Sequence, residues 1–315
     1  MSGAGYARAG AEGADSLRLP RHGRYDYLPL PLRADYDWPG GRRLAVTLVA
    51  HAEWFAFGAG LGDDPAKPGE PQTHRNYAWR DYGNRVGAWN LLELLDELRL
   101  PAAHCVDTLV YREAPALTDA IRARGDEVVA HGRTAAETLR GLWPADEARL
   151  LREVTEAITR QEGRPPAGWK AAAMRETAST PDLLKELGYR YLMDWPMDDQ
   201  PVWLRTRSGP ILALPAPVEV DDAVHVVQRR GDVGAFCDML VEQFDEMIEQ
   251  SARHPLVMNV SLHPHVAGHP FRVRGLRDAL KHCLQHPLAG RAWWCRPRDV
   301  AGHCSALPPG IVPGS

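Results

Sequence analysis

The feature of this chain that most constrains its fold is an alternation of short apolar runs with longer segments of helical periodicity. Each run is short enough to be a buried strand, and the seven runs span residues 44–50, 102–107, 127–130, 189–194, 211–214, 256–262 and 292–295. Strands that alternate with helices over most of a chain predict a parallel sheet covered by helices, as a barrel or a doubly wound sheet. No G-x-G-x-x-G follows the first run, so dinucleotide binding is not expected.

The segments between the runs carry apolar stripes at helical spacing, for example Leu150, Val154 and Ile158. We expect one α/β domain over residues 41–305, of the size that a single barrel reaches. An N-terminal extension, residues 1–40, is rich in Gly and then in Arg and Pro, and we expect it to wrap the domain surface. Residues 306–315 form a C-terminal tail.

The composition limits the partners and the cellular location that we expect for this protein. The formal net charge is −4, with 37 Lys and Arg against 41 Asp and Glu. Nucleic acid and anionic membranes are therefore not expected partners, and we expect a small molecule instead. There is no apolar run of membrane-spanning length and no secretory leader pattern, and the five widely spaced cysteines are typical of reduced, buried thiols. We therefore expect a cytoplasmic location.

Three of the predicted strands end in histidine. His51 closes the first strand, with Glu53 two residues later and therefore on the same side of the strand. His131 follows the strand at 127–130 and precedes a glycine, and His263 follows the strand at 256–262. In a barrel of parallel strands the carboxyl ends meet at one mouth, so these side chains are candidates for a shared site. Each histidine can also be a hydrogen-bonded core residue.

Further candidates lie near the same strand ends. Asp194 follows the strand at 189–194 and can orient an imidazole, whereas Asp198 and Asp199 favour either substrate binding or a turn. A Gly- and Pro-rich loop at 54–76 follows the first strand, and loops of that length inside a domain are usually functional. Arg80 and Arg85 lie where this loop is expected to enter its helix. The chain has no G-x-S-x-G, no H-E-x-x-H and no P-loop, which disfavours serine hydrolases, zincins and phosphoryl transfer.

Four stretches give the chain a family resemblance: YAWRDYGNRVG at 77–87, AHGRT at 130–134, MDWPMDDQPVW at 193–203 and LHPH at 262–265. Their order resembles the NodB-like polysaccharide deacetylase superfamily, and within it the branch of allantoinases and cyclic imide hydrolases. The resemblance implies a deformed (β/α)7 barrel, hydrolysis of a C–N bond other than a peptide bond, and a homo-oligomer.

The resemblance also bears on metal binding. Sugar-deacetylating members hold a divalent metal with one carboxylate and two histidines four residues apart, which correspond here to Glu53, His131 and Ala135. Alanine cannot ligate a metal, so metal-independent activity is expected, as in the allantoinase-like branch. His51 is a possible replacement ligand, which would give a Zn²⁺ site of His51, Glu53 and His131.

The sequence thus predicts an amidohydrolase with Glu53 as base, His263 as acid or oxyanion stabiliser, His131 holding water or metal, and Asp194 orienting these groups. Residues expected to contact the substrate are Trp54, Arg80, Tyr82, Arg85, Trp169, Asp198 and Asp199. Segments 168–173 and 215–222 depart from the branch pattern, which favours a specialised substrate. A lyase or isomerase using the same residues, and a binding barrel without activity, are the alternatives.

Overall fold

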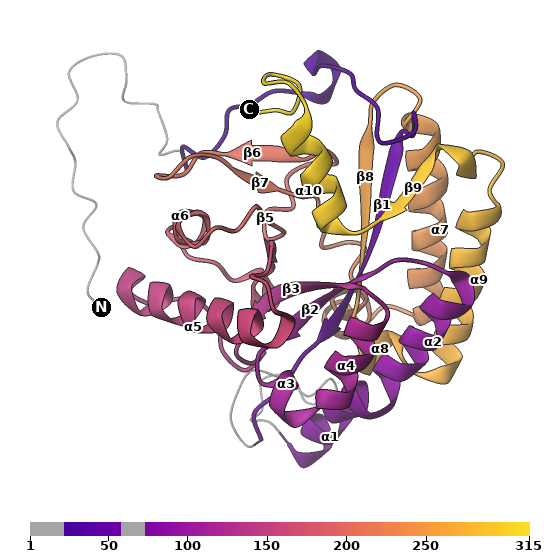
Figure 1. Cartoon of the computed structure of the whole chain (residues 1–315). Helices are drawn as coiled ribbons and strands as arrows, with labels where there is room; N and C mark the ends of the chain where they lie inside the picture. The colour runs from indigo at the N-terminus through magenta and orange to yellow at the C-terminus, as the bar shows by residue number, and fades with distance from the viewer. Residues whose placement is uncertain (1–21, 58–72) are drawn as a thin grey trace, which may run out of the picture.

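A single curled sheet forms the centre of the protein in the computed structural model, which describes residues 22–57 and 73–315 (Figure 1). Seven strands run parallel in the order β7-β5-β4-β3-β2-β1-β8. They are β1 (Leu44–Ala52), β2 (Ala103–Asp107), β3 (Glu127–Gly132), β4 (Gly168–Trp169), β5 (Tyr191–Leu192), β7 (Ile211–Ala213) and β8 (Leu256–Leu262). β6 (Val202–Leu204) adds antiparallel to β7, and β9 (Ala292–Cys295) pairs with the first half of β1. This is the deformed (β/α)7 barrel that the sequence predicts.

The barrel is open between β7 and β8, and two loop segments occupy the gap. The N–H groups of Val257 and Ser261 on β8 donate to the carbonyls of Asp199 and Val220, at 2.9 and 3.0 Å. These contacts satisfy backbone groups along an edge that would otherwise be unpaired. The chain after β5 therefore returns to the beginning of β8.

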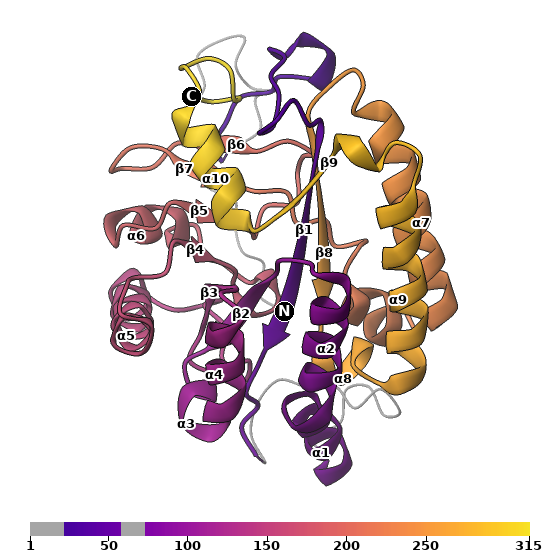
Figure 2. The same cartoon turned by 45° about the vertical axis from the view of Figure 1, so that its right-hand side comes forward.

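Helices cover the outside of the sheet (Figures 1 and 2). They are α1 (His74–Tyr82), α2 (Ala88–Leu98), α3 (Val110–Glu113), α4 (Pro115–Ala123), α5 (Pro144–Glu162), α6 (Thr180–Glu186), α7 (Val233–Gln250), α8 (Pro264–Ala267), α9 (Pro270–Gln285) and α10 (Pro297–Ala306). A π-helical turn (Gly83–Gly87) joins α1 to α2, and another spans Ala223–Gln228. Short 3-10 turns lie at Leu30–Leu32, Ala172–Met174 and Ala289–Arg291. Helix α1 begins at His74 and not at the predicted position beside Arg80. The hydroxyl of the preceding residue, Thr73, caps it by accepting from Asn76 N.

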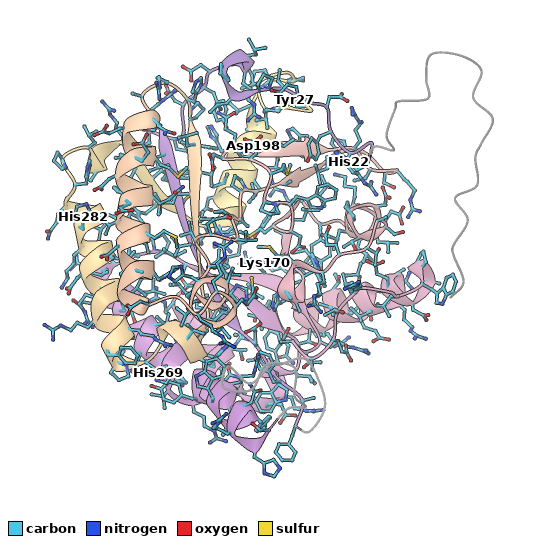
Figure 3. All side chains as sticks on the ribbon, turned by 180° about the vertical axis from the view of Figure 1, so that it is seen from behind. His22, Tyr27, Lys170, Asp198, His269 and His282 are labelled. Carbon is cyan, nitrogen blue, oxygen red and sulfur yellow. The ribbon has the colours of Figure 1, made fainter. Side chains whose placement is uncertain are left out.

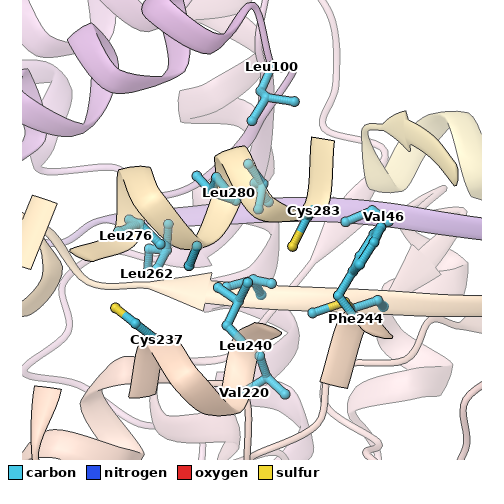
Figure 4. Packing of buried hydrophobic residues seen from close by; sticks show 14 of the residues in the cluster. Val46, Leu100, Val220, Cys237, Leu240, Phe244, Leu262, Leu276, Leu280 and Cys283 are labelled. Carbon is cyan, nitrogen blue, oxygen red and sulfur yellow. The ribbon is translucent and has the colours of Figure 1, made fainter. Parts of the chain in front are cut away.

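Side-chain alternation along the strands divides the core into outer and inner parts. Outward residues such as Val46 and Val260 pack against α2, α7 and α9, where Phe244, Leu276 and Leu280 are almost fully buried (Figure 4). A second outer cluster lies between β2–β5 and helices α4–α6. Burying each such side chain contributes roughly 1.5–3 kcal/mol. The inner cluster fills the barrel itself.

At the amino ends of the strands, the inner cluster is closed by residues that precede β1 and by residues that follow α10. Trp38, from the predicted extension, is 1% exposed and its indole N–H donates to the carbonyl of Leu256 at 3.0 Å. Val312, from the predicted tail, packs in the same cluster, and the next residue accepts a hydrogen bond from Trp203 N. The described parts of both segments thus pack on the barrel, and the division into three regions stays a prediction. All five cysteines are buried and unpaired.

The predicted strands all exist, but some differ in length. β1 and β3 extend two residues beyond the predicted ends, which brings His51 and His131 into the strands themselves. β5 and β7 are shorter than predicted, and β4 and β6 were not predicted, because two or three residues are too few to show a period. The part of the predicted functional loop at 58–72 lies outside the described residues.

Candidate active site

The structure brings the predicted strand-end residues together at the carboxyl ends of the barrel strands. Period-two alternation along β1 turns Thr47, Val49, His51 and then Glu53 toward the barrel interior. The His51 ring stacks on the His263 ring with centroids 4.0 Å apart and meets His131 edge-on at 5.0 Å. Glu53 Oε1 lies 3.5 Å from His131 Nε2. A glutamate and three imidazoles from three strands therefore share one site.

His263 is held by a buried carboxylate that the sequence analysis missed. Asp222 accepts from His263 Nδ1 at 2.7 Å, and its oxygens also accept the backbone N–H groups of His263 and Ala267. Burial lowers the pKa of His263, but the charges of Asp221 and Asp222 outweigh it and raise this pKa to about 9. At neutral pH His263 is an imidazolium, and Nε2–H is its second donor.

Glu53 and His131 form the second pair. His131 Nδ1 donates to the carbonyl of Lys170 at 2.5 Å, which directs Nε2 toward Glu53. Burial raises the pKa of Glu53, but the adjacent His131 ring and the charges of the neighbouring histidines outweigh it, so this pKa is lowered and Glu53 is ionised. Its Oε2 has no hydrogen-bond partner among the described residues. The site thus holds a carboxylate with one oxygen unused beside an imidazolium.

The loop after β1 is tied to the neighbouring strands by backbone contacts of Trp54. Its N–H donates to Asp107 Oδ2 at 2.8 Å, and its carbonyl accepts from Ala135 N and from the Thr134 hydroxyl. Burial raises the pKa of Asp107 to about 7. Asp107 ends a strand, as the predicted histidines do, so the same argument could have found it. Trp54 acts here through its backbone, while its indole packs against the outer cluster.

Asp194 positions the segment after β4. Both of its oxygens accept from Ala171 N, at 2.9 and 3.0 Å, and burial raises its pKa to about 6. It makes no hydrogen bond to the imidazoles among the described residues. Its predicted role in orienting the imidazoles stays a prediction. Its contact is with the backbone beside Lys170, a buried residue that the sequence analysis did not single out.

The predicted arginines differ in position. The Arg80 guanidinium lies 4.2 Å from the Phe55 ring centroid, and Phe55 contacts His265, which itself adjoins His263. Arg80 is therefore at the rim of the site. Arg85 is exposed and pairs with Asp81 one helical turn earlier, facing away from the site, so its prediction is not supported.

Tyr82 lies on the rim and stacks on the His269 ring at 4.2 Å. Trp169, in contrast, was wrongly placed at the site by the sequence analysis. It is 1% exposed and packs with Tyr189 in the outer cluster, because alternation along β4 turns Gly168 and Lys170 inward and the residue between them outward.

Asp198 and Asp199 lie at the opposite end of the barrel from His263. The carbonyl of Asp199 accepts from Val257 N at the beginning of β8, and Asp198 pairs with Arg33 at 2.6 Å. Figure 3 shows Asp198 beside the N-terminal segment of Tyr27 and well apart from Lys170. Their predicted substrate contact is wrong, since the chain turns back toward the amino ends of the strands after β5.

Two groups of donor atoms could hold a metal among the described residues. Within each group the atoms lie within 4.8 Å of one another: His51, Cys105 and His131 in one, and His51, Asp221 and His263 in the other. Glu53 belongs to neither group. Both depend on His51, whose Nε2 lies 3.4 Å from the Lys170 ammonium. A fixed positive charge at that distance disfavours a divalent cation, so these residues do not fit the metal of the sugar deacetylases.

An open parallel barrel with a carboxylate and an imidazolium at the carboxyl ends of its strands defines a class of acid–base hydrolases. No family model matches the chain. A protein of Schizosaccharomyces pombe, provisionally named a polysaccharide deacetylase, is 24% identical over 284 residues, which cover 78% of this chain and 86% of that one.

Solved structures of similar fold include an allantoinase and a protein named as a deacetylase. PuuE allantoinase superposes with a TM-score of 0.80 at 24% identity, covering 93% of this chain and 99% of that one. A protein from Pseudomonas aeruginosa PAO1, named a probable polysaccharide deacetylase, gives 0.77 at 25% identity, with 90% and 96% covered. The fold of the chain is thus similar to that of these deacetylases and of the allantoinase, and its sequence is 24–25% identical to theirs. Within the described residues, no helix is long and apolar enough to cross a membrane.

Proposed function

We propose that this protein hydrolyses an amide bond in a small cyclic imide or ureide, with Glu53 as the base and His263 as the acid. The reaction class, hydrolysis of a C–N bond other than a peptide bond, is that of the superfamily. The substrate and the residue roles are the proposal. One observation carries it: Glu53 and His263, whose pKa values are shifted in opposite directions, belong to one cluster, in which His51 stacks on His263 and adjoins His131, and His131 contacts Glu53.

The protonation states of the two groups at neutral pH assign their roles. Glu53 is ionised and has an unused oxygen, so it can accept a proton from the attacking water. His263 is protonated, so its Nε2–H can bind the carbonyl oxygen as negative charge develops and later protonate the leaving nitrogen. Asp222 holds the His263 ring through Nδ1, and His131 orients the Glu53 carboxylate.

The surroundings of the site favour a small substrate over a polymer. His51, His131, His263 and His265 are each at most 9% exposed. Phe55 and Trp79 pack against the ring of His265, which adjoins His263. The Arg80 guanidinium, stacked on Phe55, is the candidate for binding a substrate carbonyl or carboxylate. A cytoplasmic location and a homo-oligomeric state complete the proposal, and no observation favours the lyase or binding-barrel alternatives.

The test is turnover of a panel of cyclic imides, ureides and N-acetylated sugar oligomers by the wild type and by Glu53→Gln. Hydrolysis shows as a product heavier by one water. We expect turnover of a cyclic substrate and a loss of about 10²–10⁴-fold in kcat for the variant. Glu97→Gln is the control, because Glu97 is an exposed glutamate paired with Lys281 on the surface. Undiminished turnover by Glu53→Gln would remove Glu53 from the mechanism, and activity on sugar oligomers alone would contradict the small cyclic substrate.

A further inference from the structure

Lys170 is a buried cation at the centre of the site whose role the proposed mechanism leaves open. It follows β4, its side chain contacts the inward residues His51 and Ser261, and it is 2% exposed. Figure 3 shows it near the centre of the molecule. Its Nζ donates to Ser261 Oγ at 2.7 Å and lies 3.4 Å from His51 Nε2. None of the described carboxylates forms an ion pair with it. Burying an ammonium without a paired carboxylate is costly, so a lysine here calls for a reason beyond packing.

The contacts of Lys170 determine which nitrogen of His51 can carry a hydrogen. An ammonium has three donors and no acceptor, so His51 Nε2 must be the acceptor of this hydrogen bond. A neutral imidazole has one N–H, which then resides on Nδ1. Nδ1 is buried and has no hydrogen-bond partner among the described residues.

His51 is held neutral by its surroundings. Its ring stacks on the protonated ring of His263, at 4.0 Å and 16° between planes, and faces Lys170 on its Nε2 side. Burial lowers the pKa of His51 well below its usual range, and the charges of His263 and Lys170 lower it further. A positive charge on His51 would therefore be repelled both by His263 and by Lys170.

We propose that Lys170 fixes neutral His51 in the tautomer with hydrogen on Nδ1, and that this Nδ1–H is a second donor to the substrate oxygen beside His263. The substrate role rests on the proposed function, whereas the tautomer does not. A buried donor without a partner costs about 1–3 kcal/mol, which a substrate oxygen would recover on binding or as charge develops on it. Lys170 is then a positioning residue, and its charge takes the place beside His51 that a metal would need.

The experiment reads the tautomer directly from the full-length protein. Imidazole ¹⁵N–¹H correlation spectra of ¹⁵N-histidine-labelled protein at neutral pH distinguish a nitrogen that carries hydrogen from one that does not, and His51→Gln assigns the signals. We expect hydrogen on Nδ1 and none on Nε2. A wild-type spectrum with hydrogen on Nε2, or on both nitrogens, overturns the proposal without any variant.

Variants then test the part played by Lys170. Lys170→Met removes the donor at similar length, and we expect the His51 signals to shift toward the other tautomer, with Lys170→Arg restoring the wild-type pattern. Lys281→Met is the control, since Lys281 is a surface lysine paired with Glu97. If Lys170→Met does not fold, Ser261→Ala removes the other hydrogen-bond partner of Lys170 and should leave His51 with hydrogen on Nδ1. An unchanged Lys170→Met spectrum, or a changed one for Ser261→Ala, refutes the assignment.

Kinetics separate the tautomer from the proposed activity. On any substrate found in the panel, Lys170→Met should lower kcat by about 10-fold or more with little change in KM, because the donor acts on developing charge. A loss confined to KM contradicts the role of the second donor. If no panel substrate turns over while the tautomer is as expected, the proposed function fails and the assignment of His51 stands.

Discussion

Replacing Asp222 with asparagine should make the stability of this protein less dependent on pH between about 6.5 and 9. In the wild type the folded-state pKa of His263 is about 9, against 6.5 for an ordinary histidine. A raised histidine pKa stabilises the fold fully below pH 6.5, and this stabilisation is lost as pH rises through 9. The difference corresponds to about 3 kcal/mol of pH-dependent stability.

Asp222→Asn removes part of this stabilisation. Asp221 stays 3.7 Å from His263 Nδ1 and keeps its charge, so we expect the pKa of His263 to fall by about 1–2 units rather than to its ordinary value. The pH-dependent stability should shrink by about 1–3 kcal/mol. The variant also loses an acceptor for a backbone N–H such as that of Ala267, which costs stability at every pH. The slope against pH, not the absolute stability, is therefore the informative quantity.

The assay is urea unfolding at several pH values from 6 to 9.5, together with an NMR titration of His263. Asp245→Asn is the matched control, because Asp245 pairs with His282 at 2.8 Å on the surface, where such pairs contribute little. We expect the control to follow the wild-type slope. An Asp222→Asn variant with the wild-type slope and the wild-type His263 midpoint would refute the assignment of His263 as an imidazolium held by Asp222.

Three further outcomes follow from the structure. Protein purified without added metal should contain less than ~0.2 equivalents of divalent metal and keep its activity with a chelator, because the Lys170 ammonium lies beside His51. Stoichiometric metal that is lost together with activity would contradict this expectation. Gly87→Ala should destabilise the protein by roughly 1–3 kcal/mol in urea unfolding, because its Cβ would lie 2.0 Å from the carbonyl oxygen of Pro264, whereas Gly290→Ala, with open space around its Cβ, should not. The five cysteines should resist a thiol reagent in the native protein and all react in denaturant, because burial raises the pKa of thiols such as Cys237 to about 11 and Cys304 to about 12; rapid native labelling would show that they are accessible.

The sequence pattern by itself determined a parallel sheet under helices and the centre of the site, and the family resemblance implied the barrel. Seven apolar runs separated by helical segments leave few arrangements other than a parallel sheet under helices, and the structure has that arrangement. His51, Glu53, His131 and His263 were found because each lies at or just beyond the carboxyl end of a strand long enough to recognise. Parallel strands bring such ends together whatever their separation along the chain.

The tertiary structure decided which side chains around that centre face it. β4 has two residues, so no period in the sequence distinguishes the outward Trp169 from the inward Lys170. Asp198 and Asp199 follow a strand end, yet the chain turns back there to fill the opening beside β8. Asp222 reaches His263 only because the barrel is open between β7 and β8 and a loop lies in the gap. The local sequence pattern is enough to locate the ends of the longer strands. Contacts between segments far apart in the chain depend instead on the gap between β7 and β8 and on the loops that fill it.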